Sequence, residues 1–112
     1  MESSSLLLLT DDLLTKARAS VSGRAAQTVY GGQGHELRQT VMAIAAGRSL
    51  EDHESPGEAT VQVLRGRVHL TSGDDVMDGS PGDLLVVPPW RHALEALDDC
   101  VVLLTVVKSL NA

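Results

Sequence analysis

The sequence is short of several residue types, and each shortage excludes a class of protein. Phenylalanine is absent, and Tyr30 and Trp90 are the only aromatic residues, so Leu, Val and Ala must fill any core. The single cysteine, Cys100, excludes an internal disulfide and suits a reducing compartment. Because Cys100 begins the apolar run 100–104, we interpret it as a small core residue and not as a nucleophile.

Basic residues are also scarce. The chain of 112 residues has nine Lys and Arg against 15 Asp and Glu, which gives a net charge of −6, and no two basic residues are adjacent. Nucleic acids and anionic membranes are bound through clustered positive charge. We therefore expect neither as a direct partner.

No long apolar run is present. Leu6 to Leu9 form a run of four residues without a basic flank, and Asp11 and Asp12 follow closely. A secretory signal needs about 7–15 apolar residues after a positive start, and a membrane-spanning helix needs about 18. We therefore expect a soluble, cytoplasmic protein.

The N-terminal part carries a helical pattern. Thr10 is a candidate N-cap, apolar residues then recur at helical spacing, and Gly23 ends the pattern. This predicts a helix over about residues 10–20. We accordingly divide the chain into an N-terminal tail and helix, 1–22, and a β-barrel domain, 23–112.

After the helix the pattern changes to short runs rich in Val, Ile and Thr, separated by Gly, Pro and Asp. The expected strands are 24–30, 36–45, 60–64, 67–71, 76–78, 84–87, 92–97 and 100–107. Short strands without intervening helices predict an all-β sandwich or barrel. A jelly roll is such a fold, and it protects its edges by forming two facing sheets.

Residues 47–96 contain a first motif that begins at a glycine. Gly47 is followed by five residues and then His53, and the motif closes at Gly66. The segment 58–66 between them has the composition of a strand that ends in a tight turn.

A second motif follows the first along the chain. Gly82 is followed by five residues and then Pro88, and His92 lies downstream. In order and spacing the two motifs resemble those of the cupin superfamily, and the chain looks like a small, single-domain, bacterial RmlC-like cupin. The resemblance implies a jelly-roll barrel, or double-stranded β-helix, with a short N-terminal helix. It also implies a homodimer, in which burial of Leu6 to Leu9 would shield that run from water.

The departures from the cupin motifs concern the residues that usually hold a metal. The resemblance places His53 and His92 at two of the four ligand positions. The second histidine position is Ser55, and the glutamate position is Ala59, with Glu58 one place away. The cupin ligand set is therefore incomplete.

Two histidines need a third ligand to hold a divalent transition metal such as Zn, Ni, Mn or Fe. The candidates are Glu54, Glu58 and Gln62. In a regular strand Glu58 and Gln62 share one face, opposite Ala59. Simple alternation therefore places neither of them well.

Three further side chains have open interpretations. Trp90 is a dimer contact, the lip of a pocket, or a ring folded over the end of its own barrel. His69 alternates with Val68 and Leu70, so we expect it on the surface. His35 lies in a Gly-rich turn and is expected to be exposed.

Two hypotheses about function follow, and the fold alone does not choose between them. In the first, the barrel binds a small molecule in a regulatory or protective role, with His53, His92, Trp90 and Glu58 as ligand-binding residues. In the second, the chain is an isomerase or dioxygenase of the cupin kind, with a metal held by His53, His92 and one carboxylate. A third option is a partner of a regulatory protein that has a vestigial pocket.

Overall fold

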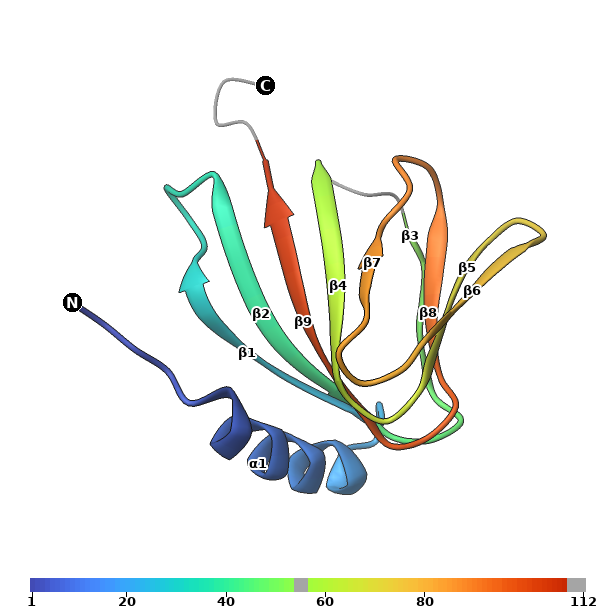
Figure 1. The fold of residues 1–112 in the computed structure, drawn as a ribbon. Coiled ribbons are helices and arrows are strands. Elements are labelled where there is room, and N and C mark those ends of the chain that lie inside the picture. Colours follow the sequence, from blue (N-terminus) through green and yellow to red (C-terminus); the bar gives the residue numbers. More distant parts are fainter. Residues whose placement is uncertain (54–56, 109–112) are drawn as a thin grey trace.

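The computed structural model describes residues 1–53 and 57–108, and the side chains of residues 52 and 53 lie outside this description. Within these ranges one helix precedes nine strands (Figure 1). The elements are α1 (Leu6–Ala19), β1 (Arg24–Gly31), β2 (Leu37–Ile44), β3 (Ser49–His53), β4 (Glu58–Arg65), β5 (Val68–Ser72), β6 (Asp75–Gly79), β7 (Leu84–Val86), β8 (His92–Ala96) and β9 (Cys100–Val107).

The strands form two antiparallel sheets. One has the order β1-β2-β9-β4-β7 and the other the order β3-β8-β5-β6. Figure 1 shows the sheets facing each other, with α1 outside them against β1 and β2. This arrangement confirms the predicted all-β jelly roll with a short N-terminal helix. Among the residues described, no helix combines the length and the apolar character needed to cross a bilayer.

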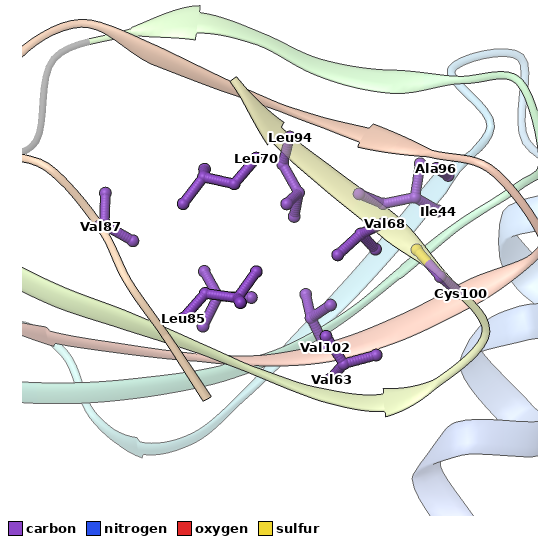
Figure 2. Close-up of a cluster of buried hydrophobic side chains, with 11 residues drawn as sticks. Ile44, Val63, Val68, Leu70, Leu85, Val87, Leu94, Ala96, Cys100 and Val102 are labelled. Atoms are coloured by element: carbon purple, nitrogen blue, oxygen red, sulfur yellow. The ribbon is translucent and has the colours of Figure 1, made fainter. Parts of the chain in front are cut away.

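Alternation along the strands creates two cores from one sheet. On β9, Val102 packs inside the barrel, whereas Val101 packs under the helix. The buried residues of the barrel core are Ile44, Val61, Val63, Val68, Leu70, Leu85, Val87, Leu94, Ala96, Cys100 and Val102. Figure 2 shows ten of them by name, with Val87 at one end of the cluster and Cys100 at the other. The cluster contains no aromatic ring, as expected for a chain without phenylalanine.

The helix begins earlier than the sequence predicts. Ser5 is the N-cap, and its Oγ accepts a hydrogen bond from the Leu8 N–H at 3.3 Å. Thr10 lies inside the helix, where its hydroxyl donates to the Leu6 carbonyl at 2.8 Å, so the prediction of Thr10 as N-cap was wrong. The physical reason is that the buried face extends back to Leu6 and Leu9, which are packed against the helix core.

The helix core joins α1 to the outer face of the larger sheet. Leu13, Leu14 and Ala17 are buried against strand residues such as Val41 and Val101. Half of the Leu6 to Leu9 run is thereby covered within the same chain, while Leu7 remains 84% exposed.

Strand β3 is the one strand of the described chain that the sequence did not predict. Its residues, Ser49–His53, include only one large apolar side chain, Leu50, so the strand signal is weak. Pairing with β8 imposes the extended conformation. The first histidine of the motif therefore ends a strand.

One end of the barrel is closed by tight turns that meet at Asp99. Gly66 has φ of +75°, and a Cβ placed there would lie 2.3 Å from the Asp99 carbonyl oxygen. The Asp99 carboxylate accepts hydrogen bonds from the Ala46 N–H at 2.8 Å and from Arg18 Nε at 2.7 Å. These bonds, that from Ala46 first, lower the pKa of Asp99 below its usual value. The closed end and the helix are thus held by one carboxylate.

Candidate functional site

The barrel contains a cavity of about 230 Å³ at the end opposite these turns. Its lining is mostly aliphatic. The apolar lining residues are Leu50, Ala59, Val61, Leu70, Val87, Leu94, Leu104 and Val106. The polar ones are Arg38 and His92. A mostly apolar cavity with a few convergent polar groups is typical of a small-molecule site.

The register of the larger sheet sets the depth of each lining residue. Arg38 pairs with Val106, and Val106 pairs with Ala59. Leu104 and Val61 pair with each other one level deeper. Because Arg38 is exposed and the deeper level is apolar, the guanidinium lies at the rim and the floor is hydrophobic.

His92 is the polar residue of the facing sheet. It is only 5% exposed, and its Nδ1 lies 2.9 Å from the Trp90 carbonyl oxygen. A carbonyl can only accept a hydrogen bond, so Nδ1 carries a proton and donates it to this bond. The Trp90 backbone therefore fixes the orientation of the His92 ring, and a ring N–H donated to a backbone carbonyl is the arrangement found in metal-binding histidines.

The register also brings the two motif histidines to one level. Leu50 pairs with Leu94, but the next recorded pair is His53 with His92, because an irregularity lies between them. Regular pairing would set residue 52 opposite His92. The extra residue in β3 thus assigns His53 to the rung of His92 at the cavity end of the barrel.

The structure does not bring Glu58 to this cavity. Glu58 and Gln62 are exposed on the face of β4 opposite Ala59 and Val61, as alternation predicts. Glu58 lines a separate surface groove beside β7. Of the other candidate third ligands, Glu54 lies outside the described residues, as does the motif position Ser55.

Trp90 contributes its backbone to the site, and its side chain is 62% exposed. The ring does not line the barrel cavity, so the alternative in which it covers the barrel end does not describe this chain. Because the ring is exposed, two interpretations of Trp90 remain: the lip of a pocket, or a contact in a dimer.

The remaining histidines lie outside the cavity, as predicted. His69 is on the outer face of β5, where Nε2 lies 2.5 Å from Asp78 Oδ1. His35 is exposed, and its ring meets Tyr30 edge-on with centroids 5.6 Å apart. Neither side chain can contribute to a site shared with His92.

The described side chains do not by themselves assemble a metal-binding group. Among the residues whose side chains are described, no group of three or more His, Cys, Asp and Glu is placed to hold an ion. Cys100 is fully buried at the closed end, and burial, as the largest cause, raises its pKa to about 12. The thiol is thus protonated at neutral pH, which confirms its structural role and rules it out as a ligand there.

Arg38 is a site residue that the sequence analysis missed. Its signal was available, because Arg38, Met42 and Ile44 have the same parity on β2, and the latter two belong to the barrel core. A charged residue on the inward parity of a strand marks either a strand end or a cavity. Only the pairing of β2 with β9 shows that Arg38 lies near the end of its strand and also lines the cavity.

Solved structures share this architecture over most of the chain. A conserved protein of unknown function from Streptococcus pyogenes is 28% identical, with a TM-score of 0.77 over 97% of this chain and 91% of that one. An RmlC-like cupin protein from Desulfovibrio desulfuricans is 26% identical, with a TM-score of 0.72 over 96% of each chain. A comparison with curated proteins finds no match.

A larger enzyme contains the same fold. A salicylate 1,2-dioxygenase mutant from Pseudoaminobacter salicylatoxidans gives a TM-score of 0.77 at 20% identity, over 92% of this chain but 33% of the enzyme. At that identity the likeness shows the fold alone. The sequence model of the Cupin domain family matches residues 40–107, which is more than half of the chain and includes both motif histidines. The chain therefore belongs to the cupin domain family.

Proposed function

We propose that this cupin binds a small organic molecule inside its barrel, in a regulatory or protective role that needs no bound metal. The observation that carries the proposal is the cavity of about 230 Å³, lined by aliphatic side chains and by one buried, oriented imidazole. Burial of an apolar ligand surface is worth about 25 cal/mol per Å² before the costs of association. His92 supplies a directional contact at the same place.

The His92 ring lines the cavity, and an imidazole can hydrogen-bond a ligand hydroxyl or amide. The orientation of the ring is fixed before binding, because Nδ1 is engaged by the Trp90 carbonyl. Preorganisation of this kind favours binding and requires no reaction. With a single buried thiol, the protein suits a reducing compartment, and we propose that it acts in the cytoplasm.

The second candidate is a metal-dependent cupin enzyme. The observation in its favour is the rung shared by His53 and His92. Such an enzyme would need a third ligand, and Glu58 lies on the outer face of β4. The other carboxylate candidate, Glu54, lies outside the described residues.

Elemental analysis of protein purified without chelator or added metal separates the two functions. The binding module predicts a metal content far below one ion per chain, unchanged in His92→Ala. The enzyme predicts near-stoichiometric Zn, Ni, Mn or Fe that is lost in His92→Ala and retained in His69→Ala. The second variant is a matched control, because His69 lies on the outer face of the barrel.

A further inference from the structure

We propose that the ligand of this barrel is a small organic anion, a carboxylate on a compact apolar body, and that Arg38 binds its carboxylate. This inference rests on the proposed function and adds to it the chemical class of the ligand. The apolar body would occupy the floor formed by residues such as Val61 and Leu104, with the carboxylate at the rim.

The position of Arg38 is the first argument. Its strand begins at the open end, and its cross-strand neighbour Val106 lines the same cavity. Among the lining residues that the structure describes, Arg38 is the one formally charged side chain, with His92 taken as neutral. A ligand whose apolar part fills the floor must therefore present its polar end to the level of Arg38.

The availability of the Arg38 guanidinium is the second argument. The ion pairs among the described residues join Lys16 to Asp12, Arg18 to Asp99, Arg65 to Asp11 and His69 to Asp78. No carboxylate of that part of the chain pairs with Arg38. In a protein of net charge −6, a guanidinium at a cavity rim that pairs with no described carboxylate is suited to an anion from outside.

The geometry of the two groups is the third argument. A guanidinium presents a planar fork of donors that matches the two oxygens of a carboxylate. One guanidinium balances one negative charge, which favours a monocarboxylate over a dianion such as a phosphate monoester. Apart from a group that His92 can hydrogen-bond, additional polar groups on the ligand would lie against the aliphatic floor without partners, at a cost in affinity.

Paired probes test this class of ligand. Benzoate and benzamide, and hexanoate and hexanamide, differ mainly in charge and can be titrated calorimetrically at low and high salt. The proteins are wild type, Arg38→Gln, Arg38→Lys and Arg67→Gln. Arg67 is a matched control because it is an exposed arginine in the turn between β4 and β5, at the closed end. Ala59→Leu fills part of the cavity and should weaken both members of a pair.

We expect wild type to prefer each carboxylate over its amide by about tenfold, and less at high salt. Arg38→Gln should abolish the preference, Arg38→Lys should retain part of it, and Arg67→Gln should leave it unchanged. Equal binding of acid and amide that is weakened by Ala59→Leu would overturn the anion assignment and leave the binding function intact. If neither the acid nor the amide of either pair bound, both the anion assignment and the proposed binding function would be overturned.

Discussion

At the residue scale, the site depends on groups that the backbone holds in place. The His92 ring is fixed by a carbonyl two residues earlier, and Asp99 is fixed by an amide of the turn after β2 and by the helix residue Arg18. In each case a polar side chain at one end of the barrel has partners supplied by turns. We therefore expect substitutions near Trp90 to affect the site, and substitutions near Asp99 to affect the stability of the fold.

Gly66 is a turn residue whose replacement should be costly. Gly66→Ala places a Cβ 2.3 Å from the Asp99 carbonyl oxygen in a positive-φ conformation, so we expect a loss of about 2–4 kcal/mol in unfolding free energy. Gly73→Ala, with φ of +59° and open space around the new Cβ, should lose only about 1 kcal/mol. Urea denaturation of both variants measures the difference, and equal losses would contradict the clash.

Cys100 makes stability depend on alkaline pH. Its pKa is raised from 9.0 to about 12 in the folded chain, so above pH 9 the unfolded thiol ionises while the folded thiol stays protonated. The contribution of the Cys100 thiol to the free energy of unfolding is complete below pH 9. Above pH 9 this contribution declines by up to about 1.4 kcal/mol per pH unit. Denaturation of wild type and Cys100→Ala from pH 8 to 11 should show a steeper decline in wild type. If the unfolding free energies of the two proteins declined in parallel with pH, Cys100 would not be the cause of the decline.

At the scale of elements, the helix and β3 show how tertiary contacts override local signals. The helix extends to Leu6 because its apolar face is covered by the larger sheet. Strand β3 forms from a polar sequence because β8 supplies its partners. The irregularity in β3 then decides which residue shares the rung of His92, and no local pattern contains that information.

The helix offers a comparison of the same substitution at two depths. Leu13→Ala removes a side chain that is 2% exposed, and we expect a loss of about 2–5 kcal/mol in unfolding free energy. Leu7→Ala alters a side chain that is 84% exposed, so its effect should be within about 0.5 kcal/mol. Thermal denaturation followed by circular dichroism distinguishes them. A small effect at Leu13 would mean that the helix is not docked in solution.

At the scale of the whole molecule, the outer edge of the larger sheet carries uncovered apolar surface. Leu84 and Val86 on edge strand β7 are 62% and 68% exposed. Exposed apolar edge strands invite pairing with a second chain. We therefore retain the homodimer as a proposal and place its interface at β7.

Sedimentation analysis tests this assembly. Wild type should have twice the chain mass of 11.8 kDa, and Leu84→Lys should shift the population toward monomer, because a lysine in an apolar interface must be desolvated. Val76→Lys is the control, since Val76 is equally uncovered, at 59%, on strand β6 of the other sheet. A wild-type mass of one chain would exclude the dimer at the concentration measured.

The sequence by itself determined the β-class of this chain, most of its strands and the two motif histidines. The reason is that the apolar run 100–107 and the turn glycine Gly66 are local features, and the structure that each one favours depends on neighbouring residues alone. Only the tertiary structure decided that Arg38 and His92 line one cavity and that β3 exists. Those outcomes depend on the pairing of β2 with β9, β9 with β4 and β3 with β8, and the register between distant strands is set by the whole barrel at once.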